Sequence, residues 1–547
     1  MRAAFAFLIV SAAAPLVAQP VIRPKGIVNA AAFQPVGVPG GAIARGSMFS
    51  IFGSGLGPAA GVQVSSFPLP AQLAGVSVKI TQGSTSVDAF PAFVIGGQLN
   101  VIMPSNAPLG LASVKVTFNG QSSNPARVLI VNNNPGLFTS TGFGIGPGSI
   151  QNFVSSDVQP LNSPLRSAQP GQFVTLWATG LGPITQPDNT APPVATLPYP
   201  VEIFVGGQAA TNILYSGRSP CCSSIDQIVF QVPANAPSGC YVPVVARVAG
   251  SAVSNTVSMS IAASGGACAD AFNPLTKLPV SGGTMGIVAL RREVRTEDVL
   301  IIPGVNITAD QAIAYFGQYA GGEFAFDPYL NLPPPGTCTT YVSTGNPEVN
   351  LPRTFAKDLS AGNLSVAGTG AATALQSVTE DVRYDFGLLG LTPQFPGVSP
   401  LPLYLNPGIY RVSATGSTDV GAFTTNLTVA AGFTWTNRNV AANVDRSQPL
   451  TLNWTGSGTF FIRGTNRDYP TNSSGTFLCN VPAGATSFTI PPYVLAPLPQ
   501  TRPTVSDSDG YIEIHSIQGT PQAITATKLT TGIAVVDFSD RRSSIFR

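Results

Sequence analysis

The stretch ARGSMFSIFGSGLGP, residues Ala44–Pro58, returns as QPGQFVTLWATGLGP at Gln169–Pro183, displaced by 125 positions. Further along, QLNVIMPSNAPLG at Gln98–Gly110 returns as QIVFQVPANAPSG at Gln227–Gly239, displaced by 129 because the second copy carries the additional segment GRSPCCSS. Self-similarity at a fixed spacing indicates two copies of one structural unit. Within each copy, apolar residues alternate over short runs bounded by Gly, Pro and Asn, a pattern typical of sandwich strands.

The glycines of the first copy raise the alternative of a phosphate-binding loop. Such a loop needs a helix directly after it, whose N-terminal amides face the anion. Here Pro58 follows, the next residues lack helical periodicity, and Ala178 stands where the first copy has Gly53. We therefore interpret both segments as tight strand exits suited to positive φ. The residues retained in the two turns are Gly55, Gly57, Pro58, Gly180, Gly182 and Pro183.

The two units resemble IPT/TIG domains, which are immunoglobulin-like, in the strand, its glycine-rich exit, the next short strand and the closing hairpin with SNPARVLI. More specifically, they resemble a secreted-protein family of Solibacter and other Acidobacteria, whose members often open with GIVNAASF where this chain has GIVNAAAF at Gly26–Phe33. The likeness covers roughly residues 26–262, and the C-terminal half shares LPPPGTCT, DVGAF, WTN and DRSQPLTLNWTGSG with the same proteins. It implies extracellular or interaction roles and brings no catalytic residues.

The chain of 547 residues is too long for one hydrophobic core. We predict an all-β protein of tandem immunoglobulin-like β-sandwiches with at most one or two short helices. The helix prediction rests on a capping-box pattern, Thr308 with Gln311. The predicted divisions are a signal peptide at 1–18, sandwiches at 19–140 and 141–263, a β-rich domain at 264–431 with a short helix near 308–318, and a C-terminal sandwich at 432–547.

The N-terminus has the layout of a secretory signal peptide: Arg2, an apolar run, then small residues that predict cleavage after Ala18. We therefore expect a secreted or periplasmic protein with no transmembrane segment after signal removal. The net charge is +2, and basic residues are adjacent only at Arg291-Arg292 and Arg541-Arg542, which argues against nucleic acid as a partner. The expected partner is a protein or polysaccharide at the cell surface, and no cofactor is predicted.

The six cysteines fit an oxidising compartment. Because a bridge between neighbours needs a strained ring, we expect Cys221 and Cys222 to pair with Cys240 and Cys268, in an order that the sequence leaves open. Exclusion then pairs Cys338 with Cys479. Disulfides are favoured over a zinc site because the chain has no C-x-x-C and a single histidine.

The densest charge in the chain is LRREVRTEDV, Leu290–Val299. If this segment is a strand, Arg291, Glu293, Arg295 and Glu297 share one face with alternating sign. We interpret it as a solvated strand face, because the arginines would keep each glutamate ionised.

The single histidine, His515, alternates with Ile512 and Ile514 and shares a face with Tyr511 and Glu513. This pattern predicts a solvent-facing side chain, and a catalytic base is the alternative.

A weak calcium candidate precedes this strand at Asp507 and Asp509. A calcium loop needs carboxylates at its first and last ligand positions, where this chain has Val505 and Ser516. We therefore predict no metal site.

The predicted function is a non-catalytic scaffold, adhesion or binding protein outside the cell. A first alternative is carbohydrate binding through aromatic residues such as Trp435 and Trp454, although Trp454 alternates like a core residue. A second alternative is a glycoside hydrolase or other hydrolase in 270–547, which needs two carboxylates ~5–10 Å apart. The carboxylates considered are Glu293, Glu297, Asp419 and Asp445.

Overall fold

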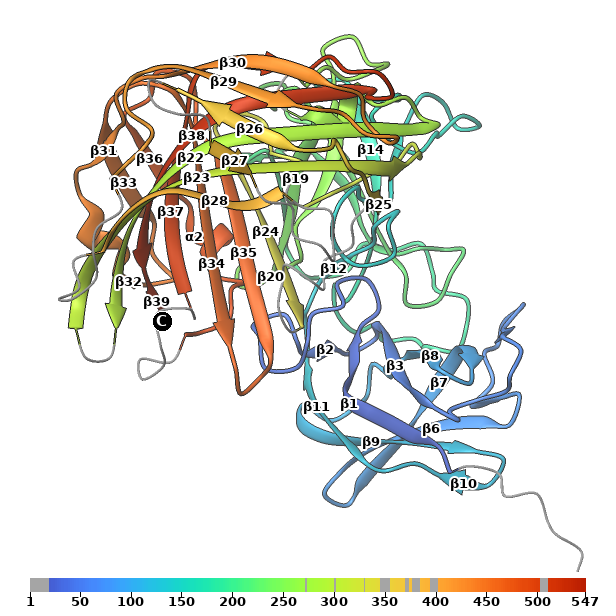
Figure 1. Ribbon diagram of the computed structural model, residues 1–547. Helices are drawn as coiled ribbons and strands as arrows, with labels where there is room; N and C mark the ends of the chain where they lie inside the picture. Colours follow the sequence, from blue (N-terminus) through green and yellow to red (C-terminus); the bar gives the residue numbers. More distant parts are fainter. Residues whose placement is uncertain are drawn as a thin grey trace, which may run out of the picture.

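The computed structural model describes residues 19–270, 273–299, 302–328, 330–344, 355–368, 373–375, 384–393, 402–501 and 510–547. The predicted signal peptide and the calcium candidates Asp507 and Asp509 lie outside these ranges, as does the side chain of Glu297. The described chain is built of strands, so the predicted all-β class of tandem sandwiches is confirmed. In Figure 1 the first sandwich, in blue, projects from a larger body that contains the rest of the chain.

The first sandwich is one long sheet folded on itself, in the order β1-β3-β8-β7-β6-β9-β11-β2. The sheet bends at β7, whose residues up to Ala89 pair with β6 and whose residues from Phe90 onward pair with β8. Alternate apolar residues of these strands meet in one core, Phe49 and Val78 among them. The strands are β1 (Val21–Asn29), β2 (Ile43–Ala44), β3 (Met48–Ser54), β4 (Val62–Gln63), β5 (Gln72–Leu73), β6 (Val76–Gln82), β7 (Thr85–Ile95), β8 (Gln98–Ile102), β9 (Gly110–Phe118), β10 (Gln121–Ser122) and β11 (Ala126–Val131).

The second sandwich packs the sheet β12-β14-β18-β17 against the sheet β16-β15-β19-β20. Leu176 and Val244 meet in its core, and the two P-x-N-A-P-x-G segments form loops between strands, as expected from their prolines. The strands are β12 (Gly136–Leu137), β13 (Ile150–Asn152), β14 (Phe173–Thr179), β15 (Val201–Val205), β16 (Gln208–Ala209), β17 (Ile213–Arg218), β18 (Asp226–Gln231), β19 (Gly239–Val248), β20 (Ala252–Val253) and β21 (Val257–Ile261).

A nine-stranded sheet dominates the C-terminal half, with the path β24-β35-β34-β37-β38-β22-β23-β25 and with β28 paired to β23. The expected division at 431/432 is wrong here, because β22 pairs in parallel with β38 and β24 pairs with β35. Strands from both sides of that boundary therefore share one sheet. The strands are β22 (Gly282–Val299), β23 (Ile302–Ala320), β24 (Thr337–Thr344), β25 (Phe355–Asp358), β28 (Tyr384–Pro393), β34 (Thr459–Asp468), β35 (Ser473–Asn480), β37 (Gly510–Ala523) and β38 (Thr531–Ser543).

Two small sheets pack on one face of the nine-stranded sheet and close two cores. The sheet β27-β26-β29-β30 buries Val412 against Val536, and the sheet β31-β33-β36 buries Trp454 against Ile462. Figure 1 shows the first small sheet over the long strands β22 and β38, and the second beside β37. The remaining elements are β26 (Leu364–Ala367), β27 (Thr373–Leu375), β29 (Gly408–Ala414), β30 (Phe423–Val429), β31 (Thr434–Trp435), β32 (Asn443–Val444), β33 (Leu450–Thr455), β36 (Ser487–Ile490), β39 (Ile545–Phe546), 3₁₀ turns at Pro274–Lys277 and Arg438–Ala441, and α2 (Pro492–Leu495).

The predicted short helix near 308–318 is wrong, since these residues lie within strand β23. Ala312, Ala314 and Phe316 are buried at the two-residue spacing of a strand, and β23 pairs with β22 on one side and β28 on the other. The capping-box residues Thr308 and Gln311 therefore form no helix start, because two neighbouring strands outweigh the local preference.

Candidate functional site

Charged side chains gather on the face of the nine-stranded sheet that is opposite the two small sheets. The register places Arg291 of β22 beside Asp537 of β38, and Glu513 of β37 beside Arg463 of β34. His515 lies next along β37. The same face includes Leu478 of β35, which packs with Tyr241 of the second sandwich.

His515 is only 5% exposed, so the expected solvent-facing position is wrong. Its ring stacks on Phe461 with centroids 4.2 Å apart. Nδ1 lies 3.1 Å from both carboxylate oxygens of Asp537, and Nε2 lies 3.1 Å from Oε2 of Glu513. Burial by itself would lower the pKa of His515, but these two carboxylates outweigh it and raise the pKa to about 9.

The alternating charges of β22 are not a solvated face either. The Arg291 guanidinium pairs with Glu513, and its Nε lies 3.7 Å from Oδ2 of Asp537. Burial would raise the pKa of Glu513, but His515 and Arg291 hold it well below its usual range. β22 is a central strand of the sheet. Both faces of a central strand can be covered by other parts of the protein, even where its residues alternate between apolar and charged.

This cluster is poorly suited to acid–base catalysis. A general base must be unprotonated near the working pH, whereas the imidazole of His515 is protonated at neutral pH and ion-paired on both nitrogens. The cluster is a closed ion-pair network, and we assign it a structural role.

Three of the four carboxylates considered for hydrolysis have described side chains, and these three do not converge; the side chain of Glu297 lies outside the described residues. Asp445 is exposed and accepts hydrogen bonds from the backbone amide and hydroxyl of Ser447. Asp419 lies in the loop between β29 and β30 and accepts a hydrogen bond from the backbone N–H of Ser360. Glu293 lies on β22, 3.9 Å from a guanidinium nitrogen of Arg541. Each therefore belongs to a different part of the fold.

Of the expected cysteine pairs, Cys338 with Cys479 is confirmed, whereas the pairing of Cys221 and Cys222 with Cys240 and Cys268 is wrong. Cys240 bonds to Cys268 and Cys338 to Cys479, but the neighbours Cys221 and Cys222 bond to each other. Cys240 lies at the start of β19, at the end of the second sandwich that faces the C-terminal half. The additional segment GRSPCCSS lies at the other end, against the first sandwich, and so the adjacent thiols have only each other.

The glycine-rich exits occupy corresponding corners with different surroundings. Gly55 and Gly180 both have positive φ, 62° and 89°. A Cβ on Gly57 would make a tight contact, 3.1 Å from the carbonyl oxygen of Ile95. A Cβ on Gly180 would lie 2.2 Å from the carbonyl oxygen of Asn134, in the chain that links the two sandwiches. The second exit therefore forms part of the joint between them.

The joint between the first two sandwiches is centred on Arg218, which comes from the additional segment of the second copy. Its side chain is 3% exposed and pairs with the fully buried Asp226. Arg218 also donates hydrogen bonds to the carbonyl oxygens of Gly46, 2.5 Å away in the first sandwich, and Gly182, 2.7 Å away in the second exit turn. One cation thus ties the two copies together.

Ser105 makes a second contact across the same joint. Its hydroxyl donates to Asp188 over 2.7 Å, and its backbone N–H donates to the same carboxylate over 2.6 Å. Burial raises the pKa of Asp188 although the Ser105 hydrogen bonds lower it. Ser105 belongs to the P-x-N-A-P-x-G loop of the first copy, so both repeated loop types take part in the joint.

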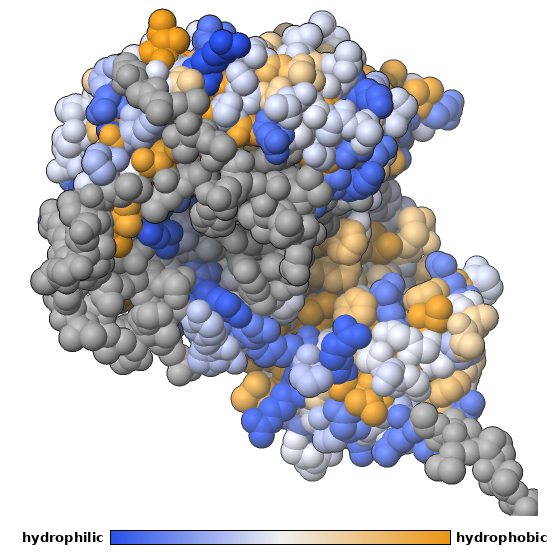
Figure 2. Space-filling model, viewed as in Figure 1, coloured by the Kyte–Doolittle hydropathy of each residue, from blue (hydrophilic) through white to orange (hydrophobic). Residues whose placement is uncertain are grey.

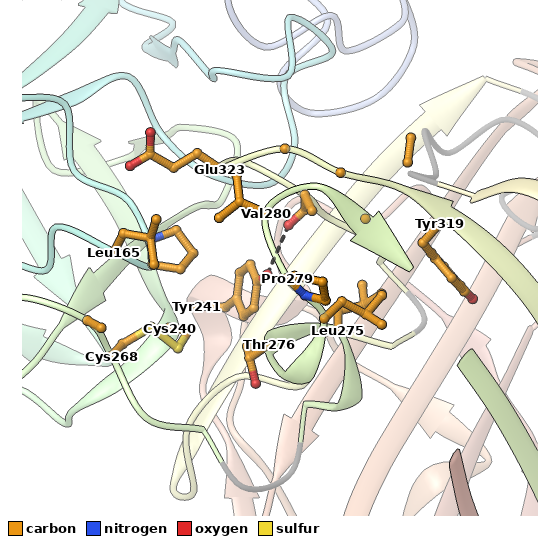
Figure 3. Close-up of a pocket in the computed structure, with 18 residues that line it drawn as sticks. Leu165, Cys240, Tyr241, Cys268, Leu275, Thr276, Pro279, Val280, Tyr319 and Glu323 are labelled. Atoms are coloured by element: carbon orange, nitrogen blue, oxygen red, sulfur yellow. Dashed lines mark hydrogen bonds between the residues drawn. A yellow bond between two sulfur atoms is a disulfide. The ribbon is translucent and has the colours of Figure 1, made fainter. Parts of the chain in front are cut away.

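A small cavity lies where the second sandwich meets the C-terminal half (Figure 3). Tyr241 lies in it beside the Cys240–Cys268 disulfide, and its hydroxyl donates to the carbonyl oxygen of Ala325 over 2.9 Å. Glu323 at its edge is paired with Arg166. The cavity measures about 170 Å³, below the ~300–1,000 Å³ of ordinary ligand pockets. We therefore interpret it as a gap in a joint.

The tryptophans considered for carbohydrate binding are buried. Trp435 is 4% and Trp454 2% exposed, so Trp454 is a core residue as its alternation indicated, and the use of Trp435 as a surface platform is wrong. Phe143, which is 62% exposed, is not marked out by any pattern in the sequence. Its neighbours in the fold come from distant segments, and no local pattern could have identified it.

Phe143 lines a groove between the first sandwich and the hairpin of β34 and β35. We call this cavity of about 610 Å³ the β1 groove. Its wall includes the segment Arg23–Gly26, where the pairing of β1 with β3 is interrupted by a bulge between Ile22 and Ile27. The side chains that matter below are Arg23, Lys25, Phe33, Phe52, Phe143 and Asn472. In Figure 2 a recess separates the first sandwich from the body over part of the visible face.

No protein-family model and no curated protein sequence matches the chain. Among solved structures, domains 5–6 of the S-layer protein SbsC are 10% identical over 44% of this chain and 98% of that chain, with a TM-score of 0.15. Titin domains A168–A170 are 11% identical over 71% and 95%, with a TM-score of 0.14. SGBP-B of a xyloglucan utilization locus in Bacteroides uniformis is 10% identical over 95% and 96%, with a TM-score of 0.15. Likeness this distant carries no argument about activity or ligand.

Two absences hold for the residues that the structure describes. Within those ranges, no three His, Cys, Asp or Glu side chains gather closely enough to hold a metal ion. No helix in the same part of the chain is long and apolar enough to cross a membrane.

Proposed function

We propose that the chain acts outside the cytoplasm as a non-catalytic scaffold, in which tandem sandwiches are held in a fixed arrangement and present a binding groove. The observation that carries this proposal is the joint at Arg218. Domains in one chain generally move relative to one another unless their interface is extensive. Here the buried Arg218, which is paired with Asp226 of its own sandwich, donates a hydrogen bond across the joint to the carbonyl oxygen of Gly46. Ser105 of the first sandwich donates two hydrogen bonds in the other direction, to Asp188.

The disposition of the ionisable groups supports a non-catalytic role. The charged face around His515 is an ion-pair network, and the carboxylates Glu293, Asp419 and Asp445 lie on separate elements. A hydrolase needs two carboxylates that face each other across a cleft. The disulfides and the predicted signal peptide favour an oxidising compartment.

A C-terminal epitope tag and protease treatment of intact cells test the location. We expect the tagged chain in the medium, or on the cells in a form that protease removes. A tag that stays protected and fractionates with the cytoplasm would contradict export.

Sedimentation with isolated cell envelopes tests the binding role. We expect the purified folded chain to sediment with the envelopes and the same chain after reduction and heating to lose that binding. Release of reducing sugars from the envelopes by the purified chain would contradict the non-catalytic assignment.

A further inference from the structure

The β1 groove has the size and lining of a ligand site. Its volume of about 610 Å³ lies within the ~300–1,000 Å³ usual for such sites. A second cavity of about 280 Å³ shares the wall segment Arg23–Gly26 with it and reaches Arg127. Two cavities along one wall fit an extended ligand better than a compact one.

The bulge that forms this wall depends on Gly26. A Cβ at this position would lie 2.5 Å from the carbonyl oxygen of Phe52 and 2.8 Å from that of Arg23, so any side chain would force the wall apart. Gly26 is the first residue of the GIVNAAAF segment. The segment therefore shapes the groove as well as starting the first sandwich.

The groove holds cations that lack counter-ions. Arg23 and Lys25 are exposed at the wall of the β1 groove, and Arg127 is exposed at the wall of the adjoining cavity. Within the described residues, none of these three has a carboxylate oxygen within 4.0 Å, which also holds for exposed cations elsewhere such as Lys115 and Arg411. What distinguishes Arg23 and Lys25 is their place on a concave wall. Asp468 acts on Lys25 only from a longer distance, and partial burial lowers the pKa of Lys25. Cations on a concave wall without counter-ions favour a ligand that carries negative charge.

Three phenylalanines supply the apolar part of the lining from separate segments. Phe33 and Phe52 lie with ring centroids 6.3 Å apart, and Phe143 projects from the loop between β12 and β13. Aromatic rings give a groove large, rigid contact surfaces for flat apolar faces, while a few polar groups fix orientation.

Backbone strain is concentrated in the same place. Eight non-glycine residues of the described chain have positive φ, and three of them line the β1 groove: Lys25 at 57°, Phe33 at 53° and Asn472 at 44°. This conformation is unfavourable for a bulky residue such as Phe33 and tends to occur at ligand-binding positions. The groove is thus held in a shape that local preference does not favour.

Resting on the binding role proposed above, we infer that the β1 groove binds an acidic polysaccharide, whose sugar rings contact Phe33, Phe52 and Phe143 and whose carboxylates pair with Arg23 and Lys25. A uronic-acid chain offers both features at each repeat: a sugar ring with apolar C–H faces and a carboxylate. Nucleic acid fits less well, because the wall offers three cations and no continuous basic stripe.

Calorimetric titration of the full chain with oligogalacturonate, and with its fully methyl-esterified form, tests this inference. The ester keeps the rings and loses the charge. We expect the acid to bind at least about tenfold more tightly, because the ester removes the charges that would pair with Arg23 and Lys25. Equal binding of acid and ester would overturn the role of the cations. Poly-glutamate, which has carboxylates but no sugar rings, should not compete, and equal competition by it would overturn the sugar class.

Matched variants locate the site. Arg23→Gln combined with Lys25→Gln should weaken binding about tenfold or more, and Phe143→Ala severalfold, with unchanged thermal unfolding. The controls are Lys115→Gln and Phe153→Ala, exposed residues outside the groove, which should bind like the parent. Loss of binding in the controls as well would contradict the location. If the chain sediments with envelopes but binds neither oligogalacturonate form, this inference fails while the proposed function stands.

Discussion

At the scale of single residues, Arg218 connects the sequence repeat to the arrangement of the domains. The two copies share strands, exits and loops, and the segment that brings Arg218 is what distinguishes the second. Asp226 is fully buried, and its carboxylate is compensated by this guanidinium together with the backbone N–H of Leu181. A buried ion pair adds little compared with an apolar pair of the same shape, but removing one partner leaves a charge without compensation.

We therefore expect Arg218→Ala to lower the free energy of unfolding by ~3–5 kcal/mol, measured by urea denaturation of the full chain. The matched control is Arg247→Ala, which breaks an ion pair with Glu202 that is about two-fifths exposed and should cost ~0–1 kcal/mol. The double variant Arg218→Met/Asp226→Leu should recover part of the loss. Equal effects of Arg218→Ala and Arg247→Ala would show that the joint does not depend on the buried pair.

His515 makes stability depend on pH in a defined direction. Its pKa is raised from about 6.5 to about 9, so the folded protein holds a proton that the unfolded chain releases. This contribution, ~3 kcal/mol, is fully present below pH ~6.5 and is lost as pH rises through ~9. The groups facing the ring are Glu513, Asp537, Arg291 and Arg463.

As pH rises from about 7 to about 10, we expect the free energy of unfolding of the parent protein to fall, and that of His515→Gln to fall less. Urea denaturation at a series of pH values measures both slopes, and their difference removes the contribution of other titrating groups. Identical slopes would contradict a raised pKa for His515.

The neighbourhood of His515 also shows how far residue patterns lead. Alternation correctly placed Tyr511, Glu513 and His515 on one face, opposite Ile512 and Ile514. It could not tell that this face is covered, because a polar strand face looks the same in sequence whether water or other charged residues lie against it. The partners Asp537 and Arg291 come from strands distant in sequence, and a single sequence does not show that pairing.

At the scale of elements, β23 shows where local signals fail. Thr308 and Gln311 fit a helix start, but the segment has Val, Ile and aromatic residues that also suit a strand. Pairing with β22 and β28 decides the outcome. The repeated strands were easier to predict, since two copies of the same alternation support each other.

The Cys338–Cys479 disulfide joins register partners on β24 and β35, 141 positions apart in sequence. Closing so long a loop restricts the unfolded chain, so we expect Cys338→Ala/Cys479→Ala to lower the free energy of unfolding by ~2–5 kcal/mol. The control is Cys221→Ala/Cys222→Ala. The bond between these neighbours restricts almost no additional chain, and its loss should cost ~1 kcal/mol or less. Denaturant titration of both variants decides, and a larger loss in the control would contradict the expectation.

At the scale of the whole molecule, the first two sandwiches have cores of their own, whereas the C-terminal half is interlaced. The cores at residues 22–130 and 137–261 are each built from consecutive strands. The nine-stranded sheet instead places β38 between β22 and β37. The fold class could be predicted from alternation and turns. The place of β38 in the sheet could not, because it depends on the parallel pairing of β22 with β38, which are distant in sequence.

Separate expression of fragments tests this organisation. We expect fragments 19–268, which keeps the Cys240–Cys268 disulfide, and 269–547 to unfold cooperatively when followed by circular dichroism. Fragments 269–431 and 432–547 alone should show no cooperative transition, because each lacks partner strands of the shared sheet. A folded 432–547 fragment would contradict the shared sheet.

The order of strands in that sheet also means that β22 is synthesised long before one of its neighbouring strands. β22 ends at Val299, and the strand that lies beside it, β38, begins only at Thr531. At ~5–20 residues per second, the ribosome leaves β22 without this neighbour for roughly 10–50 s. An open strand edge invites pairing with other chains, and charged side chains discourage it. We therefore expect Arg291, Glu293 and Arg295 to disfavour such pairing until His515 and Asp537 are synthesised and lie against this face.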